Sequence, residues 1–276
     1  MLNALVGEKI ASVSNKPQTT RTRITGIKTI GDTQLVFMDT PGLHKPKNKL
    51  SEHMLNTVTE SVVDIDLLLF MMDCTRQMTP QEEAMLLDCK RRKRPVIVIL
   101  NKIDLLEDKT RLAGMMVGIQ SRFDPASIIP ISVTEQDGVD LVEQEVLSHA
   151  KESPHFFPDE MFTDQPEKVI AAEIIREKVL RNMRDEIPHG TAVVIERMRE
   201  RQGKNIVDID ATILCEKASH KGMIIGKKGA MLKKIASESR QEIEAFLDSP
   251  VNLQCWVKVR EDWRNSEFSI RDLGFN

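Results

Sequence analysis

Residues 96–106, VIVILNKIDLL, join an apolar run to a polar pattern, and they decide the fold class of the first half of the chain. The run of Val, Ile and Leu is typical of a strand that is covered on both faces, as in a parallel sheet. Asn101, Lys102 and Asp104 follow at the carboxyl end of this strand, where open α/β sheets place their ligands. The segment therefore predicts an α/β domain with a ligand site after this strand.

The N-K-x-D pattern in this segment suits guanine. The carboxylate of Asp104 would accept hydrogen bonds from the N1–H and the 2-amino group of the base. Adenine has neither donor, and leaving the buried carboxylate unpaired costs roughly 2–4 kcal/mol. Asn101 would brace the loop and contact the base edge, and the stem of Lys102 could lie over the ring. The pattern predicts a guanine-binding loop made of Asn101, Lys102, Ile103 and Asp104.

The rest of residues 1–150 alternates strand and helix patterns. The helix candidate TPQEEAMLLDCKRRK has capping-box spacing between Thr79 and Glu82, and Pro80 suits its first position. Further buried strands are predicted in QLVFMDT (34–40), DLLLFMMD (66–73) and IIPIS (128–132). This alternation favours an α/β domain with a mostly parallel sheet.

A second candidate site is the loop DTPGL after the strand in residues 34–40. Asp39 could hold a magnesium ion through water, and the backbone N–H of Gly42 could approach a terminal phosphate. Asp, Pro and Gly are also common in ordinary turns, so the loop by itself leaves both interpretations open.

Two weaker patterns accompany these loops. Ser132 ends the strand in residues 128–132, and backbone N–H groups after it could bind the guanine carbonyl, although many strands end in serine. In NKPQTTRTRI, Thr19 or Thr20 offers a hydroxyl that could sense a terminal phosphate through magnesium. A threonine-rich loop entering an edge strand is the alternative.

Residues 151–165 break the pattern and predict a linker, with Phe156, Phe157 and Phe162 packed against a domain. From residue 166 to 276 the order becomes helix, strand, strand, helix, helix, strand, an α+β domain. Its first helix would carry an apolar face, and Gly203 would lie in the turn of the hairpin. The residues of that apolar face are Ala172, Ile175, Val179 and Met183.

The segment HKGMIIGKKGAMLKKIASESR places a G-x-x-G turn between two helices. Gly226 and Gly229 let a nucleic-acid backbone approach, and the following helix offers its N-terminal N–H groups to phosphate. From Lys217 to Arg240 there are seven basic residues and one acidic residue, in a chain with a net charge of −3. The predicted RNA-binding residues are Ile225, Gly226, Lys227, Lys228, Gly229, Lys233 and Lys234.

This pattern agrees with a KH domain that binds single-stranded RNA, and a solvated lysine-rich helix is the alternative. Because the hairpin precedes the G-x-x-G helices, the order resembles the type II arrangement. Trp256 and Trp263 could stack on bases or pack in the core.

Composition excludes several other classes of protein. Apolar residues make up 41% and charged residues 29% of the 276 residues, as in globular proteins, and the net charge excludes a uniformly basic nucleic-acid binder. The four cysteines are scattered, which favours structural roles over metal binding. No secretory signal is apparent, and no apolar run reaches the roughly 18 residues of a membrane span. We therefore expect a cytoplasmic protein.

The segments resemble, in content and order, the bacterial Era family of GTPases, in which a translation-factor-related GTPase domain precedes a type II KH domain. The matching segments are NKPQTTRTRI, DTPGLHKPK, NKID, FFPDEMFTDQPE, AAEIIREKVL, IIGKKGAMLKKI and LQCWVKVREDWR. The resemblance implies GTP hydrolysis with Mg²⁺, binding of the 3′ end of small-subunit ribosomal RNA, and a role in maturation of the 30S subunit. It also implies a monomeric cytoplasmic protein that can associate with the cytoplasmic face of the membrane.

The resemblance also assigns roles. Thr19 and Thr20 match a switch loop, Thr20 and Asp39 match magnesium-binding positions, and Thr20, Asp39 and Gly42 match catalytic positions. In this family GTP orders these loops, permits RNA binding, and is hydrolysed to release the factor. The GTP-binding residues implied are Asp39, Thr40, Pro41, Gly42, Leu43, Asn101, Lys102, Ile103, Asp104 and Ser132.

The chain departs from the GTPase pattern at two points. Leu43 stands where many signalling GTPases have a water-orienting glutamine, and the sequence contains no G-x-x-x-x-G-K-[ST] phosphate loop. In the family, MLNALVGEKI matches the helix directly after that loop. We therefore expect the first strand and the phosphate loop to be missing and GTP turnover to be impaired. The alternatives are a non-hydrolysing RNA-binding protein with a degenerate GTPase domain, or a tandem-domain ribosome factor.

Overall fold

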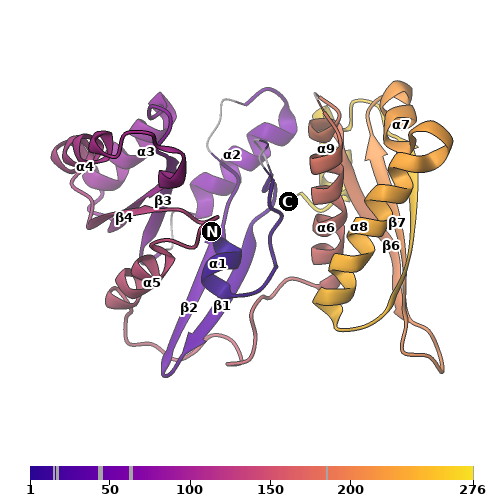
Figure 1. The fold of residues 1–276 in the computed structure, drawn as a ribbon, viewed down its shortest axis with the longest axis horizontal. Helices are drawn as coiled ribbons and strands as arrows, with labels where there is room; N and C mark the ends of the chain where they lie inside the picture. Colours follow the sequence, from indigo (N-terminus) through magenta and orange to yellow (C-terminus); the bar gives the residue numbers. More distant parts are fainter. Residues whose placement is uncertain (15, 17–18, 43–45, 62–64, 185, 276) are drawn as a thin grey trace. The chain divides into compact units, whose positions relative to one another are not determined.

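The computed structural model describes residues 1–276 except residues 15, 17–18, 43–45, 62–64, 185 and 276, and it divides into two compact units (Figure 1). Segments from the first third of the chain belong to both units, so the units do not follow sequence order. The limits inferred above for two domains and a linker stay a prediction. Unit 1 comprises Met1–Glu8, Gly26–Met38 and Val58–Phe162, and unit 2 comprises Lys9–Thr25, Asp39–Thr57 and Thr163–Asn276.

Unit 1 contains the predicted parallel sheet. Strands β3 (Leu68–Asp73), β4 (Val96–Asn101) and β5 (Ser127–Ile131) pair in parallel in that order. The apolar run at the start of β4 is buried throughout, as its composition indicated. Because the register aligns Asp73 with Asn101 and Asn101 with Ile131, the three strands end at one edge of the sheet.

Strand β2 (Thr33–Asp39) departs from the prediction. We expected it in the parallel sheet, but it pairs with β1 (Ile24–Ile30) in a separate two-stranded sheet. Only one of its residues is buried, and β1 lies two residues upstream, across a turn in which Gly31 has φ +57°. A short turn with a positive φ favours pairing between neighbouring strands, and this local pairing prevails over the apolar pattern.

The helix predicted with a capping box in unit 1 is present in the structure. In α3 (Pro80–Arg91) the capping box is confirmed, since the N–H of Glu82 donates to the hydroxyl of Thr79 and the N–H of Thr79 donates to the carboxylate of Glu82. The other helices are α1 (Leu2–Val6), α4 (Thr110–Phe123) and α5 (Val139–Ser148). The core of this unit contains Leu5, Leu35, Ile97, Ile99, Ile129, Ile131, Val142 and Val146.

The segment predicted as a linker is partly bound to unit 1. The side chain of Gln34 accepts hydrogen bonds from the backbone N–H groups of Phe156 and Phe157, and the carbonyl of Phe162 accepts one from Ile27. The backbone is therefore anchored as expected. The ring of Phe156 is 76% exposed, so its predicted packing was wrong.

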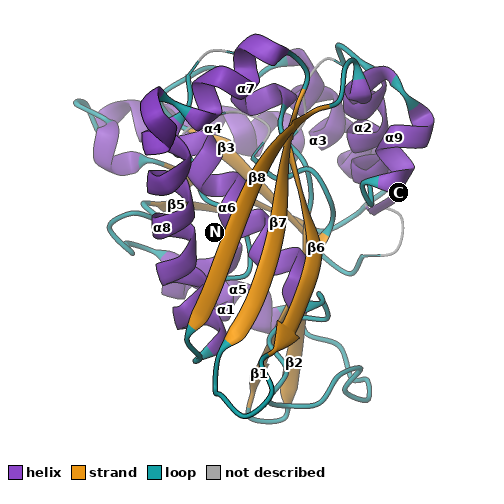
Figure 2. Ribbon diagram, turned by 90° about the vertical axis from the view of Figure 1, so that its right-hand side faces the viewer, coloured by secondary structure: helices purple, strands orange, loops and turns teal. Residues whose placement is uncertain are grey.

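Unit 2 contains the predicted α+β domain, formed by α6 (Glu167–Asn182), β6 (Ala192–Glu200), β7 (Val207–Cys215), α7 (Ala218–Ile225), α8 (Ala230–Leu247) and β8 (Val251–Val259). Strand β6 is antiparallel to β7, and β7 is parallel to β8. Figure 2 shows this sheet in front of α6 and α8, which pack on one of its faces. The type II order of elements is confirmed.

The other face of this sheet is covered in part by α2 (Lys49–Ser61) and by the C-terminal helix α9 (Glu267–Asp272). Trp263 is fully buried there, and its ring N–H donates to the carbonyl of Gly190 at 3.0 Å. Trp263 is therefore a core residue and not a stacking platform. Trp256 is 45% exposed, so its stacking role stays a prediction.

Helix α6 is buried more completely than its sequence indicated. Ile175, Val179 and Met183 are buried as predicted, and Ala172 is half-buried. The charged residues Arg176, Glu177 and Lys178 are also buried. An amphipathic pattern places charge toward solvent, so a second element must cover this side of the helix.

None of the helices in the described ranges is long and apolar enough to cross a membrane. The four cysteines form no disulfide, and burial raises the pKa of Cys255 to about 12. The structural role inferred from their spacing stays a prediction.

Candidate nucleotide and RNA sites

The guanine-binding pattern lies at the carboxyl edge of the parallel sheet in unit 1. Asn101 ends β4, and its side-chain oxygen accepts the backbone N–H of Val133 at 3.2 Å, from the loop after β5. Asn101 thus braces two loops of this edge against each other. This contact is the bracing role that the sequence predicted.

The residues after Asn101 turn sharply away from the strand. Lys102 has φ 71°, in the left-handed region, and Ile103 begins a short 3₁₀ helix that includes Asp104. Asp104 is exposed, and its carboxylate has no hydrogen-bond partner in the part of the chain that the structure describes. A free carboxylate at a strand end can accept both donors of a guanine edge.

Asp73 is a residue of this edge that the sequence interpretation missed. Its carboxylate accepts a hydrogen bond from the amine of Lys102 at 2.7 Å and another from the hydroxyl of Thr75. Burial alone raises the pKa of Asp73, but these hydrogen bonds and the charge of Lys102 bring its pKa below the usual value. The sequence did offer a signal for Asp73. It ends the apolar segment FMMD (70–73), just as Asp39 ends the apolar segment FMD (37–39).

Ser132 is buried and holds the loop after β5. Its backbone N–H donates to the carbonyl of Asp137 at 2.9 Å, and its hydroxyl accepts the N–H of Glu135 at 3.3 Å. The N–H of Ser132 itself is therefore occupied within the loop. Its place in GTP binding stays a prediction.

The two predicted magnesium-binding residues meet in unit 2. The hydroxyl of Thr20 donates to the carboxylate of Asp39 at 3.0 Å. Burial raises the pKa of Asp39, and the hydrogen bonds from Thr20 and from the N–H of Thr40 only partly oppose this. A half-buried carboxylate beside a hydroxyl, with no cationic side chain bonded to it among the described residues, suits a hard divalent cation such as Mg²⁺.

The loop after Asp39 is described only in part. Pro41 is buried and Gly42 is exposed, and a Cβ built on Gly42 meets no atom within 4 Å. Gly42 is therefore not required by packing, which leaves room for a ligand at its backbone. Leu43 lies outside the described residues.

The G-x-x-G turn has the geometry that requires glycine. Gly226 has φ 72°, and a Cβ at this position would lie 2.7 Å from the Cβ of Met231 and 3.0 Å from its backbone nitrogen. Gly229 has φ 78° and immediately precedes α8. The two glycines therefore fold the turn tightly against the start of α8.

The lysines of this turn are available to a ligand. Lys227, Lys228, Lys233 and Lys234 are exposed, whereas Ile225 is half-buried. The lysines surround the N-terminus of an 18-residue helix, whose dipole adds positive potential. The arrangement can bind a phosphate backbone. The exposure predicted for Lys227 and Lys228 is confirmed, and their role in RNA binding stays a prediction.

Two family models match the chain. The model of a 50S ribosome-binding GTPase matches residues 1–102, and the model of a KH domain matches residues 186–264. Because the GTPase match extends from the first residue, it gives no support to the expectation of an impaired enzyme or to a degenerate GTPase domain.

Curated relatives and solved structures agree with these matches. The chain is 49% identical to GTPase Era of Ruminiclostridium cellulolyticum over 275 residues, covering 100% of this chain and 92% of that protein. It is 46% identical over 276 residues to GTPase Era of Clostridioides difficile, covering 100% and 93%.

Two solved structures are similar to the whole chain, each with a TM-score of 0.95 and 35% identity over 99% of this chain and 93% of the other. One is Era in complex with MgGDPNP and nucleotides 1506–1542 of 16S ribosomal RNA. The other is a variant of Aquifex aeolicus Era bound to GDP and AlF₄⁻.

Proposed function

Because the chain belongs to the Era family of GTPases, we propose that it binds and hydrolyses GTP and uses its KH domain to bind the 3′ end of small-subunit ribosomal RNA during maturation of the 30S subunit. The observation that carries this proposal is the braced loop from Asn101 to Asp104. There Asn101 is bonded to the loop after β5, and the exposed carboxylate of Asp104 follows three residues later in a short 3₁₀ helix. This geometry suits a guanine base.

Thr20 and Asp39 would hold Mg²⁺, with Asp39 acting through water, and Gly42 would offer its backbone N–H to the terminal phosphate. The ion supplies charge neutralisation at the phosphates, and positioning by the protein does the rest in phosphoryl transfer. The close approach of Thr20 to Asp39 supports this assignment. The order–disorder response of such loops to a terminal phosphate would make the nucleotide a switch for RNA binding.

GTP turnover tests the enzymatic part of this function. The 276-residue protein is assayed with GTP and with ATP, in the presence and absence of single-stranded RNA from the 3′ end of 16S ribosomal RNA. We expect magnesium-dependent turnover of GTP alone. Absence of turnover under all these conditions would favour the non-hydrolysing RNA-binding alternative.

The RNA-binding part is tested by reversing charge in the G-x-x-G turn. The double substitution Lys227→Asp and Lys228→Asp should abolish binding of the same RNA, because both side chains are exposed beside Gly226. The control is Lys168→Asp with Lys204→Asp, which changes the net charge equally at exposed sites outside the turn. Equal RNA affinity of the two double variants would reject the KH site.

The family also implies a monomer in the cytoplasm with the 30S subunit as partner and a peripheral contact with the cytoplasmic face of the membrane. We include these in the proposed function. Cosedimentation with 30S subunits and with vesicles containing anionic lipids tests the two partners separately. Light scattering of the free protein tests the monomer.

A further inference from the structure

The segment Lys9–Thr25, which contains the predicted switch threonines, is bound along the charged side of α6. Glu177 is fully buried, and its carboxylate accepts hydrogen bonds from the N–H of Val13 at 2.6 Å and from the amine of Lys9 at 2.7 Å. The amine of Lys16 donates to backbone carbonyls at the C-terminal end of the same helix. The charged side of α6 is therefore an interface with this segment and not a solvent face.

Arg176 is the residue of α6 that reaches the switch threonines. It is 2% exposed, its Nε donates to the carboxylate of Glu173 at 2.8 Å, and its Nη2 donates to the carbonyl of Thr19. The hydroxyl of Ser12 lies 2.8 Å from the carboxylate of Glu173 and 3.4 Å from Nη2 of Arg176. Burial alone raises the pKa of Glu173, but the charge of Arg176 brings its pKa below the usual value, so the pair is ionised.

Thr20 and Arg21, which follow Thr19, are each bonded to a different part of unit 2. Thr20 donates to Asp39, the other predicted magnesium-binding residue. The guanidinium of Arg21 is buried and donates to the carbonyls of His189 at 2.8 Å and Thr191 at 2.6 Å, just before β6. A movement of Thr20 toward a ligand therefore changes the contacts of both arginines.

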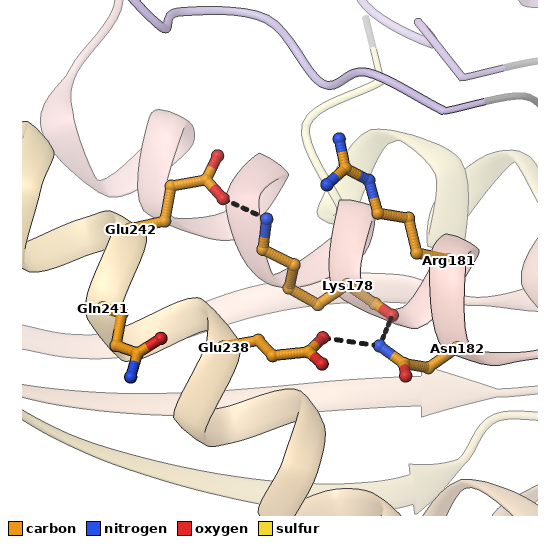
Figure 3. Close-up of a pocket in the computed structure, with 6 residues that line it drawn as sticks. All are labelled: Lys178, Arg181, Asn182, Glu238, Gln241 and Glu242. Atoms are coloured by element: carbon orange, nitrogen blue, oxygen red, sulfur yellow. Dashed lines mark hydrogen bonds and ion pairs between the residues drawn. The ribbon is translucent and has the colours of Figure 1, made fainter.

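Helix α6 is bonded in turn to α8, the helix that begins at the G-x-x-G turn. Figure 3 shows the amide of Asn182 donating to Glu238 at 2.7 Å and the amine of Lys178 paired with Glu242. These residues line a cavity of about 510 Å³ between the two helices. Polar and charged contacts thus continue from Thr19 through α6 to the RNA-binding helix.

Three atoms of this network lack a hydrogen-bond partner among the described residues, namely Nε of Arg21, Nη1 of Arg176 and Oε1 of Glu242. The Nη1 of Arg176 is buried and has no hydrogen-bond partner among the described residues. Buried polar atoms are nearly always paired, so a second arrangement in which this atom gains a partner would remove the cost of leaving it unpaired. Switching elements have such pairs of discrete arrangements.

We propose that Arg176 is a positioning residue that couples the Thr19–Thr20 loop to the RNA-binding helices α7 and α8. Its hydrogen bond to Thr19 holds the loop on α6, and it rearranges when Thr20 is drawn toward a nucleotide. The α6–α8 contacts pass the change to the G-x-x-G turn. This role rests on the proposed function, because it needs a ligand for Thr20 and an RNA for α8.

Hydrogen exchange of the full chain tests the coupling. The probe is a single-stranded RNA from the 3′ end of 16S ribosomal RNA, and the readout is exchange in peptides covering residues 9–25. In the wild type we expect RNA to change this exchange by about 5-fold or more, the lower end of typical coupling between sites. Arg176→Lys keeps the positive charge but loses the guanidinium that bonds Glu173 and Thr19 together. In this variant we expect RNA to change the exchange of residues 9–25 by less than about 2-fold, with unaltered RNA affinity.

The matched control is Arg260→Lys, which alters an arginine that pairs with Asp272 and makes no contact with residues 9–25 among the described interactions. It should respond to RNA as the wild type does. If Arg176→Lys fails to fold, Ser12→Ala takes its place. Ser12 belongs to the segment Lys9–Thr25, and this substitution removes its hydroxyl, which lies beside Glu173 and Arg176. An RNA response of wild-type size in Arg176→Lys or Ser12→Ala, or no response in the wild type, would overturn the inference.

A second measurement separates this inference from the proposed function. It is the ratio of the RNA dissociation constants with MgGDP and with MgGDPNP, for which we expect about 5 or more in the wild type and about 1 in Arg176→Lys. A wild-type ratio of 1 with intact RNA binding counts against the proposed nucleotide switch, and the exchange result then decides the role of Arg176. Loss of RNA binding in every protein counts against the KH assignment instead.

Discussion

The carboxyl edge of the parallel sheet in unit 1, where the guanine-binding loop is predicted, and the α6 interface of unit 2 use polar residues in opposite ways. At the edge, Asn101 and Asp104 belong to one short segment, and Asp104 is exposed and unpaired within the described residues. At the interface, Arg176 and Glu177 are buried, and besides partners on α6 itself each has a partner more than 150 residues away in the chain, Thr19 for Arg176 and Val13 for Glu177. A recognition loop keeps its charge free for a ligand, whereas a buried network uses its charges on the protein itself.

This difference predicts where substitutions act. A change at the edge removes an interaction with a ligand that the folded protein does not need, so it should alter binding and leave stability unchanged. A change in the interface leaves buried charges without partners, so it should alter stability as well. The substitutions below test this division from the largest expected effect to the smallest.

The largest effect is expected at Glu177. Glu177→Ala removes the fully buried carboxylate that binds Lys9, Lys178 and Arg181, and it leaves Lys9 and the buried Lys178 to share the single carboxylate of Glu242. Breaking a buried ion pair from one side costs about 3–5 kcal/mol. Urea unfolding should show a loss of this size in the transition that reports on unit 2. The control Glu267→Ala removes an exposed partner of Lys49 and should change the stability little.

The second effect concerns binding alone. Asp104→Asn replaces the acceptor for the two guanine donors and should weaken GTP binding by about 2–4 kcal/mol. Xanthosine triphosphate, which presents a carbonyl in place of the 2-amino group, should bind the variant better than GTP does. Competition binding measures both, and the unfolding midpoint should not move. Asp108→Asn, in the same exposed stretch, is the control, and equal losses in the two variants would contradict the assignment.

The third effect lies between the two classes. Gly226→Ala places a Cβ 2.7 Å from that of Met231 on a backbone with φ 72°, and it should destabilise unit 2 by about 1–3 kcal/mol and weaken RNA binding. Gly222→Ala has no atom within 4 Å of its new Cβ and lies inside α7, so it should stabilise the protein by about 0.5–1 kcal/mol. Thermal unfolding and RNA titration of the pair test whether close packing, and not flexibility, requires glycine at 226.

The smallest effect is a dependence of stability on pH. Burial raises the pKa of Asp39 above 3.8, so the folded state binds more protons than the unfolded state between 3.8 and the raised value. The contribution of Asp39 is therefore favourable below pH 3.8 and is lost as the pH rises through the raised pKa. Without nucleotide and Mg²⁺, Asp39→Asn should be more stable than the wild type at pH 7, and the difference should disappear near pH 3.8.

Asp208 provides the control of opposite sign. Hydrogen bonds from Arg201 and then from Asn252 lower its pKa to about 2. Its contribution is present above pH 3.8 and is lost as the pH falls toward 2, so Asp208→Asn should be less stable than the wild type at neutral pH. Urea titrations across pH 2–7 measure both variants. If both substitutions changed the stability at neutral pH in the same direction, the raised pKa inferred for Asp39 would be contradicted.

Much of the fold was predictable because its signals are local. The capping box at Thr79, the buried run of β4 and the tight turn at Gly226 each depend on residues within a few positions of one another. The pairing of β2 was not predictable from its apolar pattern, because the choice between a neighbouring hairpin partner and the parallel sheet depends on what covers the strand. The candidate site divides in the same way. Asn101 and Asp104 were predicted from one contiguous pattern and their role stays a prediction, whereas Asp73 was missed because its partner Lys102 follows a different strand.

The class of each half, the predicted guanine-binding loop and the G-x-x-G turn follow from the sequence alone, since they arise from contiguous residues with fixed backbone requirements. Only the tertiary structure decided that the segment Lys9–Thr25 belongs with α6 and that Arg176, Glu177 and Lys178 are buried. Charge is costly to bury without a partner, so charged residues in a helix are expected in solvent. Some of the partners that make burial possible, such as Lys9, Val13 and the carbonyl of Thr19, come from a distant segment that no local pattern in α6 indicates.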